Sequence, residues 1–175
     1  MEKEPMIQII QKTKEYLNYI EDHYNSVQKA WKIIQEKCDE KCFPFLYDDF
    51  KFFTLDKQIK EHDLSKLSMP EFVPYRQTFF PVSPEEKEKA KTDFAMAWEH
   101  HKANNDHHWE NWTKDKSMGI ELCVAHNVCD WMAMGMKFND TARDYYDKNK
   151  SKMQIPEWAD TMTCEIFDCV YGVEK

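Results

Sequence analysis

The spacing of apolar residues along this chain predicts that most of it is helical. Between Pro5 and Lys37, apolar residues recur at intervals of three and four, as they do along one face of an α-helix. The same repeat returns in later segments, which begin at Pro84, near Met118 and at Pro156, with a shorter helix expected from Thr141. Three glycines are too few for the many tight turns of an all-β chain. The sequence therefore predicts an all-α protein.

The predicted helix at Pro84 has a well-defined start. Ser83 is a good N-cap, Pro84 suits the first helical position, and Glu86 completes a capping box. The apolar face then continues through Trp98. Asn104-Asn105-Asp106 predicts an interruption, followed by a second short helix.

Two stretches of the chain do not keep a helical repeat. Residues 38 to 57 mix aromatic and acidic side chains without a period, so we expect a loop with one short helical turn. A short helix from Leu55 to Leu64 is expected next, with His62 and Asp63 at its C-terminal end. Several prolines predict a rigid and mostly irregular connection over residues 70 to 84.

The segment from about Met118 to Phe138 is apolar nearly all round, which is typical of a central helix. Asp130 lies in it, where a carboxylate is costly unless it is paired or bound to a cation. His126 precedes Asp130 by four residues and Lys137 follows it by seven, so all three share one face. Asp130 is therefore a candidate metal ligand, whereas a hydrogen-bonding role in the core or beside a metal is favoured for His126.

Composition limits the size and the partners of the protein. A chain of 175 residues, 42% of them hydrophobic, suits one domain with a sizeable core, which we expect to span residues 1–175. The net charge of −8 argues against a duplex nucleic-acid partner, because phosphate contacts need a basic surface. A homo-oligomer is compatible with the sequence.

Compartment is indicated by segments that the sequence lacks. No run approaches the roughly 20 apolar residues of a membrane span. The N-terminus has no apolar signal-peptide core, and the six cysteines form no Cys-x-x-Cys pair. We therefore expect a cytoplasmic protein without a membrane partner, whose thiols, including those of Cys164 and Cys169, are reduced and serve in packing.

The dipeptide His62-Asp63 is the strongest chemical signal in the chain. Imidazole nitrogen and carboxylate oxygen are both good ligands for divalent metals. Adjacent side chains on a helix diverge by about 100°, so the pair suits two metals, or one metal with an outer partner, better than one ion. Lys66 lies one helical turn after His62, where its ammonium group can meet a phosphate oxygen.

Four histidines lie between positions 100 and 108. Helical phase places His101 on the apolar face and His100 toward the opposite side. In the short helix expected next, His108 lies beside inward-facing tryptophans and His107 turns outward. His101 and His108 are therefore the candidate ligands, and the alternative is a surface cluster that binds metal only loosely.

His23 and Arg76 each allow two interpretations. His23 lies at the edge of the first apolar stripe, where a hydrogen-bonded boundary histidine is common, but the His-Asp pair downstream favours a metal ligand. The guanidinium of Arg76 can pair bidentately with a phosphate or form a surface salt bridge.

The order of His23, then His62-Asp63, then further histidines, then Asp130 resembles the HD-domain superfamily of metal-dependent phosphohydrolases. This resemblance implies a single-domain HD-type helical bundle of about six helices. The metal ligands that it implies are His23, His62, Asp63, His101, His108 and Asp130. They would hold one to three divalent ions, drawn from Mn, Fe, Co, Zn, Mg and Ni.

The same resemblance implies a reaction class and a substrate class. HD enzymes mostly act on nucleotides, including cyclic ones, so we expect a nucleotide-type phosphate ester to be cut by a metal-activated water. Asp63 and Lys66 are the expected catalytic residues. Lys66, Arg76 and Lys137 are expected to contact the phosphate of the substrate.

The chain also resembles an uncharacterised family of small bacterial and phage proteins. That resemblance spans most of residues 15 to 150 and supplies no activity. It lies in the segments His62-Asp63-x-Ser65-Lys66, Glu71-Phe72-x-Pro74-Tyr75-Arg76, His100-His101, His107-His108-Trp109 and Asp130-Trp131-x-Ala133-Met134.

Two other functions stay open at this point. Some HD proteins with this order of ligands are di-iron oxygenases, and their sites also use histidine and carboxylate. A non-catalytic phage or bacterial protein that sequesters a nucleotide or a host partner is the third possibility.

Overall fold

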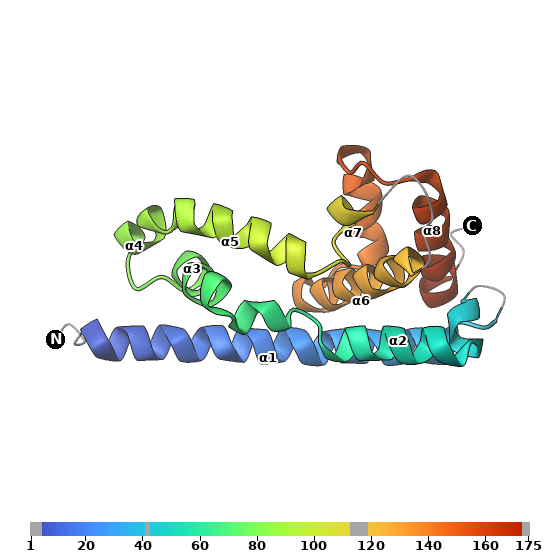
Figure 1. Ribbon diagram of the computed structural model, residues 1–175, viewed down its shortest axis with the longest axis horizontal. Coiled ribbons are helices and arrows are strands. Elements are labelled where there is room, and N and C mark those ends of the chain that lie inside the picture. The colour runs from blue at the N-terminus through green and yellow to red at the C-terminus, as the bar shows by residue number, and fades with distance from the viewer. Residues whose placement is uncertain (1–4, 41–42, 113–118, 173–175) are drawn as a thin grey trace. The chain divides into compact units, whose positions relative to one another are not determined.

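The computed structural model describes residues 5–40, 43–112 and 119–172, and within these ranges its regular secondary structure is entirely helical (Figure 1). Eight α-helices and four short 3₁₀-helices follow one another in the described ranges. The all-α prediction is confirmed, with more helices than the expected number. None of the described helices combines the length and apolarity needed to cross a bilayer.

Backbone contacts divide the chain into two compact units. Unit 1 comprises Met1–Tyr24 and Asp63–Asn105, and unit 2 comprises Asn25–His62 and Asp106–Lys175. The first helix, α1 (Pro5–Lys37), contributes residues to both units and has the bounds that its apolar repeat predicts. The expectation of one domain over residues 1–175 stays a prediction.

Unit 1 consists of the first part of α1 and the helical elements that follow Asp63. These elements are η2 (Leu64–Leu67), α3 (Met69–Phe79), α4 (Pro84–Lys89) and α5 (Lys91–Asn104). Helix α3 packs against α5, and η2 contacts both (Figure 1). The small core of this unit consists of Tyr16, Tyr75 and Ala97, with further aromatic rings packed around them.

Helix α3 replaces the first part of the irregular connection predicted for residues 70 to 84, so that prediction is wrong up to Phe79 and holds for residues 80 to 83. Pro70 lies in the first turn, where the amide that proline lacks has no helical partner to lose. Pro74 lies inside the helix and removes one internal hydrogen bond, yet the helix continues to Phe79. The prolines therefore shape this helix without preventing it.

The predicted helix start at Ser83 is confirmed. The backbone amide of Glu86 donates a hydrogen bond to Ser83 Oγ at 3.3 Å, and Pro84 occupies the first turn. The apolar face expected to run on without interruption is divided at Ala90, where α4 ends and α5 begins.

Unit 2 has the larger core, built from the second part of α1 and the elements around α6. These elements are η1 (Pro44–Tyr47), α2 (Asp49–Lys60), η3 (Trp109–Asn111), α6 (Ile120–Phe138), α7 (Ala142–Asn149), η4 (Lys150–Lys152) and α8 (Glu157–Tyr171). Helix α6 contacts α2, α7 and α8 (Figure 1). The expected starts of the last two helices, after Thr141 and Pro156, are confirmed.

Helix α6 is the buried helix that its apolar sequence predicts, and Met118 lies outside the described residues. Asn139 ends the helix in the left-handed conformation, with φ of 54°. The chain then turns back so closely that a Cβ on Gly135 would lie 2.7 Å from the carbonyl oxygen of Asp140. Glycine is therefore required at this position for α7 to start where it does.

Helix α2 begins within the stretch predicted to be a loop, residues 38 to 57, so that prediction is wrong for its second part. The Asp48 side chain caps the helix and accepts a hydrogen bond from the amide of Lys51 at 3.1 Å. The helix ends at Lys60, so His62 and Asp63 lie in the turn after it and not on its last turn.

The described cysteines serve mainly in packing. Cys38, Cys123 and Cys129 are buried free thiols, and Cys164 is a partly buried one. Burial raises the pKa of Cys38 and of Cys123 to about 11, so both stay protonated at neutral pH. Cys169 is disulfide-bonded, so the expectation that it is a reduced thiol is wrong.

Candidate metal centres

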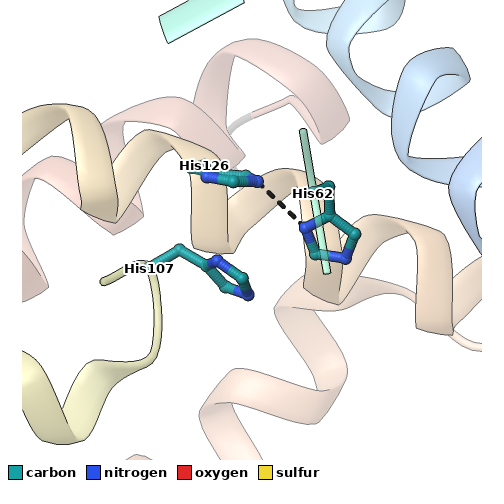
Figure 2. Close-up of side chains that lie close together, drawn as sticks. All are labelled: His62, His107 and His126. Atoms are coloured by element: carbon teal, nitrogen blue, oxygen red, sulfur yellow. Dashed lines mark hydrogen bonds between the residues drawn. The ribbon is translucent and has the colours of Figure 1, made fainter. Parts of the chain in front are cut away.

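Three histidines of unit 2 converge in the core of that unit. His62 follows α2, His107 precedes η3, and His126 lies on α6. All three are buried, and each offers a ring nitrogen within 4.8 Å of the other two (Figure 2). His62 Nδ1 and His126 Nε2 are 2.9 Å apart, and the rings of His107 and His126 lie 4.3 Å apart between centroids.

Local structure fixes each of these side chains. The amide of His62 donates to the carbonyl oxygen of Ile59 at 3.2 Å, which holds the turn after α2. The carbonyl oxygen of His107 accepts a hydrogen bond from Trp112 Nε1 at 3.2 Å. His126 is held by the buried helix α6. Two of the three segments carrying the cluster are therefore turns tied to buried groups.

Asp130 lies beside this cluster. One carboxylate oxygen, Oδ1, is 3.8 Å from His62 Nε2, the ring nitrogen opposite to the one that faces His126. A carboxylate on the far side of a ligating imidazole commonly fixes the orientation of the ring. Unit 2 thus brings together two residues expected to bind metal, His62 and Asp130, and adds His107 and His126.

The donor set of this cluster, defined as His62, His107 and His126, fits a divalent transition metal. Imidazole nitrogens bind zinc and similar ions at about 2.1 Å, so two of them on a tetrahedral ion stand about 3.4 Å apart. The nitrogen separations in the cluster bracket that spacing, since one pair is 2.9 Å apart and all lie within 4.8 Å. Three neutral histidines also leave a position for water or substrate, as in catalytic zinc sites.

Unit 1 carries a different cluster, centred on Asp63. This residue is one of two described non-glycine residues with positive φ, at 55°. Lys66 Nζ lies 2.5 Å from Asp63 Oδ2, His23 Nε2 lies 3.7 Å from the same oxygen, and His101 Nε2 lies 3.3 Å from Oδ1. The structure therefore brings four expected site residues together within unit 1.

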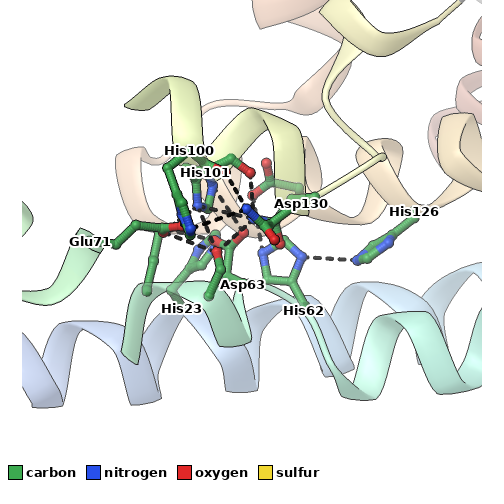
Figure 3. Close-up of polar contacts among 12 residues, drawn as sticks. His23, His62, Asp63, Glu71, His100, His101, His126 and Asp130 are labelled. Carbon is green, nitrogen blue, oxygen red and sulfur yellow. Dashed lines mark hydrogen bonds and ion pairs between the residues drawn. The ribbon is translucent and has the colours of Figure 1, made fainter. Parts of the chain in front are cut away.

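Glu71 completes the cluster of unit 1 (Figure 3). Its carboxylate is fully buried, and it lies 2.7 Å from His100 Nδ1 and 2.8 Å from His101 Nδ1. Ser65 Oγ donates to the same carboxylate at 3.0 Å. His101 is thus held between two carboxylates, one at each ring nitrogen.

The two tyrosines nearest Lys66 remain neutral. Burial raises the pKa of Tyr16 and of Tyr75 well above the ordinary range, and the positive charge of Lys66 only partly opposes this effect. The Lys66 ammonium lies 5.8 Å from the centre of the Tyr75 ring. Both phenols therefore contribute shape and dipole to unit 1 and no charge.

Arg76 and Lys137, the other two residues expected to contact phosphate, make different contacts in the structure. Arg76 forms a bidentate pair with Glu86, at 2.9 and 2.8 Å. This is the salt bridge that the sequence allowed for Arg76 as the alternative to a phosphate contact. Burial of Glu86 alone would raise its pKa, but the hydrogen bonds and charge of Arg76 outweigh burial and lower it. Lys137 is exposed near the end of α6, with its ammonium 5.7 Å from the centre of the Phe138 ring.

The facing predicted for the histidines at positions 100 to 108 is only partly right. His101 is buried, as predicted. His100 does not point away, because it shares the Glu71 carboxylate with His101. The outward orientation predicted for His107 is wrong: its side chain is buried, whereas His108 is partly buried against the His107 ring.

A helical phase error explains the misplacement of His107. Both histidines precede η3, so no regular helix relates their directions to those of the tryptophans. No site role is predicted for Glu71 from sequence, because the prolines around it predict an irregular segment and not the helix α3. The signal for His126 is its four-residue spacing to Asp130, which places both on one face of the helix.

Comparisons with known proteins give a family and no activity. Neither the curated proteins nor the solved structures include a match to this chain. A family model described as a family of unknown function, DUF5662, matches residues 12–170. The match covers most of α1 and continues through α8, so the chain belongs to this family of unknown function.

Proposed function

We propose that this protein is a metal-dependent phosphohydrolase. The observation that carries the proposal is the buried cluster of His62, His107 and His126, whose ring nitrogens lie within 4.8 Å of one another. Three buried imidazoles this close together can offer three nitrogen ligands to one cation. A divalent transition metal is the cation that this donor set favours.

The residues of unit 2 would have different roles at this metal centre. His62, His107 and His126 would hold the ion through neutral ring nitrogens, and Asp130 would orient His62 from its other side. Bound there, the ion supplies Lewis acidity, which neutralises phosphate charge and lowers the pKa of a water toward about 7. That chemistry suits hydrolysis of a phosphate ester.

The residues of unit 1 supply part of the groups that the HD resemblance assigns to metal and phosphate. Asp63 faces His23 through Oδ2 at 3.7 Å and His101 through Oδ1 at 3.3 Å, so its two oxygens offer donors beside two different histidines. Lys66 is the cation that we assign to the phosphate, because it is buried beside Asp63. Arg76 is held by Glu86, and we assign it a structural role.

A nucleotide, linear or cyclic, is the substrate class that we propose. This part of the proposal rests on the likeness to HD enzymes alone. The acidic chain, with a net charge of −8, fits a small ligand that meets local metal charge better than it fits a polymer of phosphates.

The test is a substrate screen with defined metals. The purified protein is stripped of metal, reloaded with Mn, Co, Fe, Zn or Mg, and assayed on nucleotide monoesters, diesters and cyclic nucleotides. We expect turnover with at least one ion, loss of turnover in His126→Ala, and little change in Glu86→Gln, a matched carboxylate change away from the histidines.

Two results would overturn the proposal. Metal bound at the cluster without turnover on any phosphate ester would indicate a binding protein. Iron binding accompanied by a visible absorption band and oxygen consumption would indicate an oxygenase.

A further inference from the structure

Glu71 is the most deeply buried charged side chain of unit 1 that the proposed function leaves without a role. It is fully buried and contacts two histidines and a serine. It lies on the first turn of α3, whereas both histidines lie on α5. A buried carboxylate with this many polar contacts is either a tie between two helices or a group that sets the state of its partners.

The geometry at His101 distinguishes its two ring nitrogens. Nδ1 lies 2.8 Å from Glu71 Oε2, a normal hydrogen-bond distance, and Nε2 faces Asp63 Oδ1 at 3.3 Å (Figure 3). An ionised carboxylate only accepts hydrogen bonds, and each ring nitrogen faces one; because the contact at Nδ1 is shorter by 0.5 Å (2.8 against 3.3 Å), we assign the proton of a neutral His101 to Nδ1. The lone pair is then on Nε2, directed toward Asp63.

We propose that Glu71 is a positioning residue, which fixes His101 as the Nδ1–H tautomer and thereby presents Nε2 to a metal ion beside Asp63. The inference rests on the proposed metal-binding function. Carboxylates that accept a hydrogen bond from a ligating histidine orient the ring and raise its basicity, and their loss commonly weakens metal binding by about 10- to 100-fold. Glu71 itself binds neither metal nor substrate.

His100 shares this carboxylate and supplies an internal comparison. Its Nδ1 lies 2.7 Å from Glu71 Oε1, but its side chain is 36% exposed, against 2% for His101. Asn105 Nδ2 lies 3.1 Å from His101 Nδ1 but donates to Ser65 Oγ and to the His101 carbonyl oxygen, at 2.7 Å each, so it does not need Nδ1 as an acceptor. Glu71 is therefore expected to set the tautomer of His101 while leaving His100 dispensable for metal.

The test measures tautomer and metal affinity separately from turnover. Long-range proton–nitrogen NMR of ¹⁵N-histidine-labelled protein identifies which ring nitrogen carries the proton, and a Co²⁺ titration followed by absorption gives the affinity. We expect wild-type His101 to be protonated on Nδ1. In Glu71→Ala we expect a mixed tautomer and Co²⁺ affinity at this position lowered about 10- to 100-fold.

Three further variants keep the test decisive. Glu71→Gln preserves the shape and one acceptor oxygen without the charge, so it should fold and give a smaller loss. Glu86→Gln, in the same unit, and His100→Ala should leave the His101 tautomer and Co²⁺ affinity unchanged.

A purely structural role for Glu71 predicts a different result. The variants at Glu71 would then unfold at lower temperature but show the wild-type tautomer and wild-type Co²⁺ affinity when folded, which would overturn the proposal. Metal binding at the unit 2 cluster is followed independently by comparing wild type with His126→Ala. If the two bind the same number of ions, the proposed function is refuted and the role of Glu71 is not.

Discussion

The two units hold their histidines by different chemistry. In unit 1, His101 lies between the carboxylates of Glu71 and Asp63, at 2.8 and 3.3 Å. In unit 2, the close contact is between two imidazoles, with His62 Nδ1 and His126 Nε2 separated by 2.9 Å. The first arrangement places a carboxylate at each ring nitrogen, whereas the second places one ring against another.

This difference determines what each cluster needs. A ring N–H facing a carboxylate is satisfied within the protein, and added charge on the ring is compensated. Facing imidazoles can share one proton, but a second proton places like charges side by side in a buried site. The proposed metal site therefore predicts that a bound cation stabilises unit 2 more than unit 1.

The largest expected effect is stabilisation of unit 2 by metal. Zn²⁺ at about one hundred times its dissociation constant should raise the free energy of unfolding by about 2.7 kcal/mol. Hydrogen exchange should slow most in α2 and α6, the helices next to and carrying cluster residues. In His126→Ala the slowing in α6 should disappear. Protection confined to α3 and α5 would contradict the comparison.

A smaller effect is expected on stability when one buried tyrosine of each unit is replaced by phenylalanine. Tyr146 in unit 2 donates a hydrogen bond to Asp160 at 2.7 Å, whereas the buried Tyr16 hydroxyl of unit 1 has no hydrogen-bond partner among the described residues. Tyr146→Phe should therefore cost about 1 kcal/mol, and Tyr16→Phe should be neutral or slightly stabilising. Chemical denaturation of the two variants measures both changes. Equal losses would show that the Tyr16 hydroxyl is satisfied in solution.

The smallest expected effect concerns pH and the Arg76–Glu86 pair of unit 1. The folded pKa of Glu86 is lower than its unfolded value, so the pair stabilises the fold at pH above the ordinary glutamate pKa of about 4.3. The contribution is lost as pH falls through the lowered folded value. Glu86→Gln should thus be less stable than wild type at pH 7, and the difference should shrink in acid.

The control for that measurement is Glu88→Gln. Glu88 forms an exposed ion pair with Lys91 at 2.6 Å, and such pairs contribute little to stability. A difference between Glu86→Gln and wild type that stays constant from neutral to acid pH would show that the carboxylate charge is not the stabilising feature.

Sequence predicted the helices whose apolar repeat is unbroken. The 3.6-residue period fixes Pro5–Lys37 because one face of that helix is apolar along much of its length. It fails in α2, where Phe50 and Phe53 are 80% and 67% exposed, so aromatic positions no longer mark the inner face. It fails in α3 because prolines argue against a helix in the sequence, although Pro70 fits the first turn of this one.

The candidate site could likewise be predicted only in part. His62, Asp63 and Asp130 follow from their residue types and from the cost of a carboxylate in an apolar helix. His107 does not follow, because the direction of a side chain in a turn depends on tertiary contacts, here the hydrogen bond from Trp112 to its carbonyl oxygen. Glu71 could be assigned only when its two histidine partners were located on α5.

The most direct test of the central claim, that His62, His107 and His126 form a metal site, is the metal content of two neighbouring variants. His107 is buried in the cluster, and His108, the next residue, was the ligand expected from sequence. Equilibrium dialysis with Zn²⁺ should show one ion fewer per chain in His107→Ala than in wild type, and an unchanged number in His108→Ala. A wild-type number of ions in His107→Ala, or a loss confined to His108→Ala, would contradict the account.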